Sequence, residues 1–331
     1  MNTETARKVM IDVLRGVAAI AVVFFHLNEA YPPLSDLYHR AVKWGWLGVP
    51  VFFVISGYCI AAAREKDGLI SFWFRRLLRI FPPYWASIVL VLGIVILRLV
   101  HTGTNDLTIL PADASALIYT ALALTNPASS VPGINWAYWS LGYELAFYLV
   151  MGVLVYRPAG LWVILFSALS LFVPAFPLDH WGLFGLGVAS HYFLRKNHPA
   201  AALLALLCAA SCFVHLGLIQ TLCGVFTTLL ILFPPAWIAL PLFRPLAQAG
   251  LFSYSLYLIH VPIGCYFLPH YFPITFSREL GPSLVQDLLF LTVCLLSAYL
   301  FYRLIEKPSH AFARRITSRP ISPPASPQHT R

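Results

Sequence analysis

Long apolar stretches that contain few charges recur along this 331-residue chain, and they limit its possible folds more than any other feature. A helix needs about 20 mostly apolar residues to cross a bilayer. Hydrophobic residues make up 59% of the chain and charged residues only 11%, which is too apolar for a soluble domain of this length. The sequence therefore predicts an all-α, polytopic integral membrane protein. The roughly ten transmembrane helices fall at 9–28, 46–63, 83–101, 137–156, 160–176, 180–194, 199–217, 220–241, 249–269 and 284–303.

The basic residues provide a check on this count, because loops that face the cytoplasm carry an excess of Lys and Arg. If the N-terminus is cytoplasmic, sixteen basic residues fall in loops on that side and only Arg40, Lys43 and Arg278 fall on the other. This asymmetry predicts that both termini are cytoplasmic. It also explains the net charge of +9 without nucleic acid as a partner.

No change of composition divides the chain, so we expect one membrane domain over residues 1–310. Residues 311–331 are rich in Pro and Ser toward their end, and we expect them to form a disordered cytoplasmic tail. The outer loop from Thr102 to Asn135 contains an apolar stretch that suits the membrane interface or a re-entrant segment. Two interpretations of this loop stay open, a lid over an outward-facing site and a plain connection.

The first apolar run also has features of a signal peptide, because Arg7 and Lys8 precede it and it contains small residues. A membrane helix is favoured, since Arg15 and His26 interrupt the run and no clear cleavage site follows. The six cysteines lie inside apolar spans without the spacing of a zinc site, so we expect buried free thiols.

Four ionisable residues inside the predicted spans, Arg15, His26, Glu144 and His260, indicate a site, because charges within a bilayer are costly. Arg15 and His26 are eleven positions apart, so at about 100° per residue they share one stripe of the first helix, about 16 Å apart along its axis. His26 then lies near the outer end of that helix. Glu144 reaches a similar depth from another span, and we expect it to orient the His26 imidazole and raise its basicity.

Each of these residues also has a plainer explanation. A membrane histidine such as His260 often bonds neighbouring helices together, and Arg15 can extend its side chain to the interface. Ser56 and Gly57 suit close helix packing better than nucleophilic catalysis, since the sequence places no base beside Ser56. The convergence of His26 with a carboxylate from another span is what favours a site.

A basic block lies between the second and third predicted spans, in the segment SFWFRRLLRIFPPYW. Helical spacing puts Arg75 and Arg79 on one face with Arg76 alongside, and Pro82 and Pro83 start the next span. Such a cluster in the cytoplasm binds phosphates through charge-assisted hydrogen bonds, or it anchors the helix to anionic lipid heads. Charge alone favours the lipid interpretation.

Six motifs follow one another along the chain. They are Arg15-x10-His26 with Asp12, Trp46–Val49 with Phe52–Tyr58, Arg76-x-x-Arg79 with Pro82 and Tyr84-Trp85, Trp139–Glu144 with Phe147-Tyr148, Ser253–Pro262, and Glu306-Lys307-Pro308. Each motif alone is weakly specific, but six in this order are strong. From about residue 10 to residue 308, the chain resembles the acyltransferase-3 family of membrane-bound O-acyltransferases.

The resemblance implies about ten spans with cytoplasmic ends in a plasma membrane, here a bacterial inner membrane. It implies an acyl-CoA donor, usually acetyl-CoA, and an acceptor hydroxyl on a polysaccharide, lipid-linked sugar or other glycan; no metal is expected. Membrane lipids are further partners. The implied site residues are His26 and Glu144 for catalysis, Arg15, Arg75, Arg76 and Arg79 for the CoA phosphates, and Asp12, Ser56 and His260 in support.

Two routes of transfer remain open. His26 either deprotonates the acceptor for direct attack or carries the acyl group itself. The main alternative function is a transporter or flippase for an anionic lipid-linked or glycan substrate, which would share the topology but has no need of the cytoplasmic arginine block. The aromatic residues Trp136, Tyr138 and Trp139 suit an interfacial belt better than sugar stacking.

Overall fold

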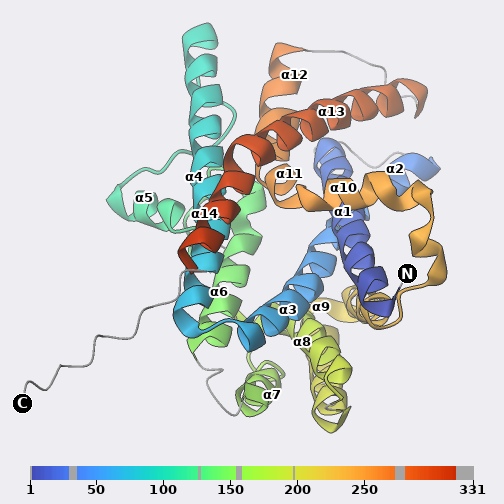
Figure 1. Ribbon diagram of the computed structural model, residues 1–331. Helices are drawn as coiled ribbons and strands as arrows, with labels where there is room; N and C mark the ends of the chain where they lie inside the picture. Colours follow the sequence, from blue (N-terminus) through green and yellow to red (C-terminus); the bar gives the residue numbers. More distant parts are fainter. Residues whose placement is uncertain are drawn as a thin grey trace, which may run out of the picture.

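A computed structural model describes residues 2–29, 36–125, 128–153, 159–196, 198–272 and 280–317, and all regular elements in these ranges are helices (Figure 1). The predicted all-α fold is confirmed. The α-helices are α1 (Thr3–Glu29), α2 (Leu37–Val42), α3 (Gly48–Lys66), α4 (Leu69–Thr102), α5 (Ala114–Ala121), α6 (Trp139–Val153), α7 (Ala159–Leu169), α8 (Trp181–Leu194), α9 (His198–Leu232), α10 (Arg244–Leu251), α11 (Ser253–His260), α12 (Leu268–Tyr271), α13 (Leu280–Phe301) and α14 (Lys307–Thr317).

Five helices in the described ranges are long and apolar enough to cross a membrane, and the bent pair Pro241–Leu251 with Ser253–Tyr271 adds up to one more. The helices α6, α7 and α8 occupy predicted spans but have only 15, 11 and 14 residues. Large apolar side chains such as Val100, which is 81% exposed, cover the outer surface. These features support a multi-pass membrane protein, and the number ten stays a prediction.

The long helix α9 covers the predicted span 199–217 and the first part of the predicted span 220–241, up to Leu232. Gly217 interrupts its helical geometry with φ 80° and ψ 177°. Glycine adopts this conformation readily because it has no Cβ. The break therefore falls where the sequence predicted the end of one span.

The arginine block and the apolar run after it form one continuous helix, α4, although the sequence analysis separated them at Pro82 and Pro83. Pro82 has no N–H, so the Leu78 carbonyl loses its intrahelical donor. The Ser309 hydroxyl of α14 donates a hydrogen bond to that carbonyl. This contact fixes α14 against α4, where the two helices pack side by side (Figure 1).

The helix α14 also revises the predicted tail. It continues to Thr317, so residues 311–317 are helical rather than disordered. The remainder of that prediction, residues 318–331, lies outside the described residues.

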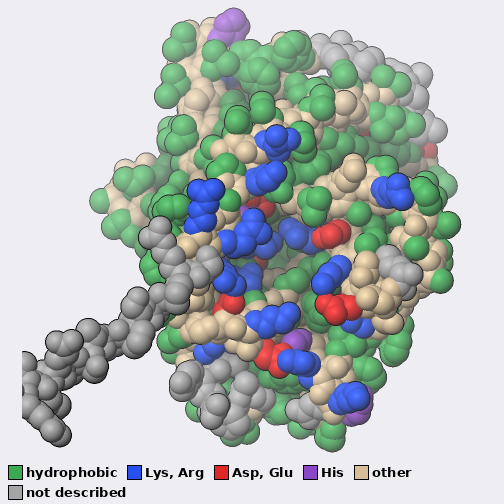
Figure 2. Space-filling model, in the orientation of Figure 1, with side chains coloured by type: hydrophobic (Ala, Val, Ile, Leu, Met, Phe, Trp, Pro, Cys, Tyr) green, Lys and Arg blue, Asp and Glu red, His purple; other side chains and the backbone are tan. Residues whose placement is uncertain are grey.

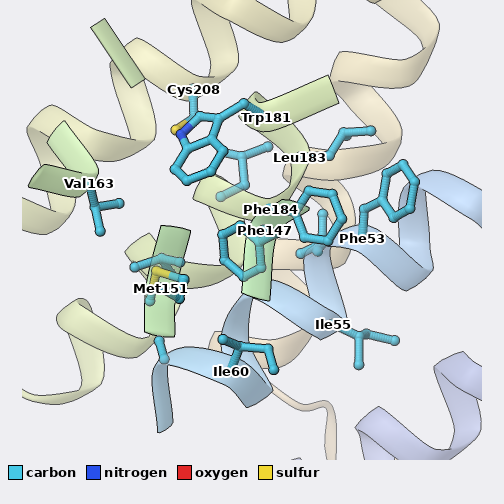
Figure 3. Packing of buried hydrophobic residues seen from close by; sticks show 14 of the residues in the cluster. Phe53, Ile55, Ile60, Phe147, Met151, Val163, Trp181, Leu183, Phe184 and Cys208 are labelled. Carbon is cyan, nitrogen blue, oxygen red and sulfur yellow. The ribbon is translucent and has the colours of Figure 1, made fainter. Parts of the chain in front are cut away.

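Close packing of α3 against α8 forms the centre of one hydrophobic core. A Cβ at Gly57 would lie 2.0 Å from the Phe184 carbonyl oxygen, and a Cβ at Gly187 would lie 2.0 Å from the Val54 carbonyl oxygen. The Phe184 ring stacks on Phe53 at 4.4 Å and on Phe147 at 4.6 Å, which joins α3, α8 and α6 (Figure 3). The preference for a packing role at Gly57 is confirmed.

We predict that Gly57→Ala destabilises the protein by about 1–3 kcal/mol, because the new methyl group forces α3 and α8 apart. Gly93→Ala in α4 is the matched control, since nothing lies within 4 Å of its added Cβ. The control should be neutral or slightly stabilising. The midpoint of thermal unfolding in detergent measures both variants, and equal midpoints would contradict the packing argument.

Candidate active site

A small cavity of about 100 Å³ brings together side chains from α1, α3, α4 and α6. Arg15, Ser56, Arg76, Arg79 and Glu144 all line it. Each of these residues stood out in the sequence, but spacing along the chain does not show that they share one cavity. Three guanidinium groups beside one carboxylate give this cavity an excess of positive charge, which suits an anionic ligand.

Glu306 provides a buried negative charge for this cluster. Its side chain is 1% exposed, and its Oε2 accepts hydrogen bonds from the Ser255 hydroxyl at 2.6 Å and the Ser255 N–H at 3.2 Å. Arg15 and Arg79 lie within electrostatic range of this carboxylate. Glu306 was not among the selected site residues, although the motif Glu306-Lys307-Pro308 contained the signal.

Two donors at this cavity have no partner among the described residues. The Arg76 Nε and the Ser253 Oγ are buried there without a hydrogen bond. The Arg76 guanidinium packs over the rings of Phe72 and Tyr148, at 5.7 and 5.9 Å from the ring centroids. Buried donors are normally paired, so these two atoms add capacity for an acceptor such as a phosphate oxygen.

Arg75 differs from its two neighbours in the arginine block. Its Nη1 donates to Asp67 Oδ1 at 2.7 Å and its Nε donates to Thr317 Oγ1 at 2.9 Å. The sequence predicted that Arg75 and Arg79 lie on one helix face, with Arg76 alongside. The residues that line the cavity are Arg76 and Arg79. Residues three and four positions apart both share a helix face, and it is the packing of α14 that draws Arg75 away.

A larger cavity of about 690 Å³ contains His26. The His26 Nδ1 lies 2.8 Å from Glu29 Oε2 and 3.2 Å from the indole N–H of Trp136. These contacts require opposite protonation of one atom, because Nδ1 needs a proton to donate to Glu29 and must lack one to accept from Trp136. When Nδ1–H faces Glu29, the Nε2 keeps its lone pair, as a general base requires.

The carboxylate beside His26 is thus Glu29, whereas the sequence analysis expected Glu144. Glu144 Oε1 accepts hydrogen bonds from Ser56 Oγ at 3.1 Å and from the Tyr148 hydroxyl. Helical arithmetic suggested a similar depth for Glu144 and His26, but it gave no information on which way α6 turns the Glu144 side chain. Glu29 was available from the sequence, because it lies three positions after His26 on the same helix.

His260 lies next to His26, with ring centroids 5.2 Å apart. The His260 Nδ1 donates to the backbone carbonyls of Tyr257 at 2.8 Å and Leu256 at 3.2 Å, which leaves a bare Nε2. That atom is buried and has no partner in the described part of the chain. The plainer explanation of His260 was a hydrogen bond between helices. Both of its hydrogen bonds instead stay within α11, and its ring lies beside that of His26.

The structure also describes Asp12 and the cysteines. Asp12 lies within electrostatic range of Arg15 on the same helix. All six cysteines are free thiols, as expected. Within the described ranges, no three His, Cys, Asp or Glu side chains group as ligands of a metal ion.

We call the small cavity with the three arginines the cationic cavity, and the larger cavity with His26 the His26 chamber. Val49 belongs to the walls of both, so the two cavities adjoin. Figure 2 shows Lys and Arg side chains gathered around a hollow on one face of the molecule, over α3, α4 and α14. The arrangement can hold an anion on the basic side and present its far end toward an imidazole paired with a carboxylate. An activated hydroxyl in the larger chamber could then be a nucleophile.

Comparison with known proteins agrees with these features. A family model described as an acyltransferase domain matches residues 9–303. The chain is similar to acyltransferase MdmB of Streptomyces mycarofaciens, with 30% identity over 141 residues that cover 41% of this chain and 36% of that protein. It is also similar to peptidoglycan O-acetyltransferase OatA of Listeria monocytogenes, with 37% identity over 99 residues that cover 27% of this chain and 14% of that protein. No solved structure matches the chain.

We predict that Glu306→Ala destabilises the protein by about 2–4 kcal/mol, because the buried hydroxyl and N–H of Ser255 both lose their acceptor. Glu65→Ala is a suitable control, since Glu65 pairs with Arg195 but its side chain is 40% exposed. That change should cost no more than about 1 kcal/mol. Thermal unfolding in detergent compares the two variants, and similar losses would contradict a buried acceptor at Glu306.

Proposed function

The chain belongs to the acyltransferase family whose model matches residues 9–303, and from that premise we propose that it is a membrane-bound O-acyltransferase. It transfers an acyl group, most simply acetyl, from cytoplasmic acyl-CoA to a hydroxyl of a polysaccharide, lipid-linked sugar or related glycan. The observation that carries the proposal is the cationic cavity that adjoins the His26 chamber at Val49.

The donor binds from the cytoplasmic side in this proposal. Arg15, Arg76 and Arg79 pair with the CoA phosphates, since guanidinium groups form charge-assisted, bidentate hydrogen bonds with phosphate. The basic face in Figure 2 becomes the cytoplasmic face, in line with the positive-inside distribution of Lys and Arg. Ten spans with both termini in the cytoplasm of a bacterial cell complete this topology.

The acyl transfer itself is proposed to use His26 as a general base. His26 Nε2 takes the proton of the acceptor hydroxyl, and the oxygen attacks the thioester carbonyl. The carbon–sulfur bond breaks, and the imidazolium returns the proton to the CoA sulfur. Glu29 holds the Nδ1 proton throughout and stabilises the imidazolium, which is the role that we first expected of Glu144.

The larger chamber is proposed to hold the acceptor. Trp46, Trp136 and Trp139 all line it, so these aromatic side chains are available to pack on a sugar ring as well as to form an interfacial belt. The name of the Listeria relative, a peptidoglycan O-acetyltransferase, supports a glycan as the acceptor class. Membrane lipids surround the helices on all sides.

We predict that His26→Ala lowers the transfer rate by about 10²–10⁴-fold, the usual contribution of a general base. Transfer of radiolabelled acetyl groups from acetyl-CoA to surface glycans measures the effect, with acetyl-CoA binding as the control for folding. If glycan acetylation continues unchanged, the proposal fails. If acetylation stops only because the glycan no longer reaches the outer leaflet, the transporter alternative is supported instead.

A second prediction separates two adjacent arginines. Arg76→Gln should raise the KM for acetyl-CoA by about 10- to 150-fold, the equivalent of about 1.5–3 kcal/mol for a hydrogen bond to a charged group. Arg75→Gln should leave this KM nearly unchanged, because Arg75 is bonded to Asp67 and Thr317 instead. Steady-state kinetics on the purified protein compare the two variants. Equal effects on the KM would show that the small cavity lined by Arg15, Arg76 and Arg79 is not the donor site.

A further inference from the structure

The chamber around His26 continues into a second lobe of about 490 Å³. Trp136, Trp139 and His180 line both lobes, so the two volumes meet at these side chains. Pockets for small molecules typically measure about 300–1,000 Å³. Each lobe alone is therefore large enough for one small ligand group, and together they have room for more than one.

The loop that follows α4 supplies one wall of this second lobe. Its helix α5 packs against the middle of α4, where Tyr84 and Trp85 donate hydrogen bonds to the carbonyls of Thr120 and Ala121. This level is about 26 Å below the end of α4, at 1.5 Å per residue. Irregular backbone at membrane depth is tolerated where it lines a cavity. The loop thus returns to the chamber and lines it, so it is more than a plain connection between helices.

Thr125 places an unused hydroxyl at this wall. The residue is 3% exposed and lines the second lobe, and its Oγ1 has no partner among the described residues. Gly133 lies beside it, since an added Cβ there would be 3.6 Å from that oxygen and 3.2 Å from the Asn135 carbonyl oxygen. A buried hydroxyl without a partner is unfavourable, so a ligand that supplies a hydrogen bond at this point is favoured.

His180 provides a second polar group where the two lobes meet. Its Nδ1 donates to Asp179 Oδ2 at 3.1 Å, and the same oxygen accepts from the Tyr143 hydroxyl at 2.9 Å. This arrangement keeps the proton on Nδ1 and a lone pair on Nε2. The His180 ring also packs edge-on against Trp139, with centroids 5.7 Å apart, so its orientation is fixed from two sides.

We propose that the second lobe is a subsite for the sugar ring next to the one that is acylated. Thr125 and His180 form hydrogen bonds with hydroxyls of that ring, and Trp136 and Trp139 pack on apolar ring faces between the lobes. This inference rests on the proposed function and narrows its acceptor to an oligosaccharide of at least two linked rings. A single sugar fills only the lobe that contains His26.

The test uses the purified 331-residue chain with N-acetylglucosamine and its β-1,4-linked dimer as probes. Tryptophan fluorescence gives the Kd of each sugar without donor, and radiolabelled acetyl-CoA gives the rate of transfer to each. The wild-type chain should bind the dimer at least about tenfold more tightly, since the second ring adds more than one hydrogen bond. Thr125→Val should raise the Kd of the dimer about five- to tenfold.

Thr120→Val is the matched control. Thr120 lies on the same loop, is also 3% exposed and also has an unpaired hydroxyl, but it lines neither lobe. Equal affinities for monomer and dimer in the wild-type chain, no binding of either sugar, or equal effects of the two substitutions would each overturn the subsite. If the dimer is preferred and Thr125→Val removes the preference, but no acetyl group is transferred, the subsite stands and the proposed function falls.

Discussion

The burial of positive charge inside an apolar helix bundle is the constraint on which the rest of this structure depends. Arg15 and Arg79 approach one cavity from two helices, and the surrounding lipid offers no water to solvate them. The buried carboxylate of Glu306 lies within electrostatic range of both, in the π-helical segment Tyr302–Glu306 before α14. Ser309 then fixes α14 to α4 at the carbonyl that Pro82 leaves without a donor. The contacts that make the charges tolerable also hold the basic cavity in shape.

The same organisation separates two kinds of chemistry by a short distance. Cations gather at the smaller cavity, while an imidazole with its carboxylate lies in the larger one, and Val49 belongs to both walls. A donor that is charged at one end and reactive at the other suits this division, because its two ends need different surroundings. His26 is held by a residue of its own helix, so its orientation depends little on movements between helices.

Local patterns identified much of the site, because spacing along one helix is fixed by covalent geometry. The pair Arg15 and His26, the nearby Arg76 and Arg79, and His260 all came from such patterns. The partner of Glu144 did not, since a contact between helices depends on how each helix rotates about its axis. For the same reason the partners of Arg75 were not predicted: Asp67 lies before α4, and Thr317 lies on α14, 242 residues further along the chain.

The sequence by itself determined that this chain is helical and belongs in a membrane, because hydrophobic run length and charge distribution act locally and do not depend on packing. It also showed which ionisable residues lie inside apolar spans, where burying a charge is costly. Only the tertiary structure decided that Ser56 bonds to Glu144, that Thr317 bonds to Arg75, and that Thr125 and His180 border one chamber. These contacts join residues through the rotation, tilt and docking of separate elements, and no spacing within one segment encodes those quantities.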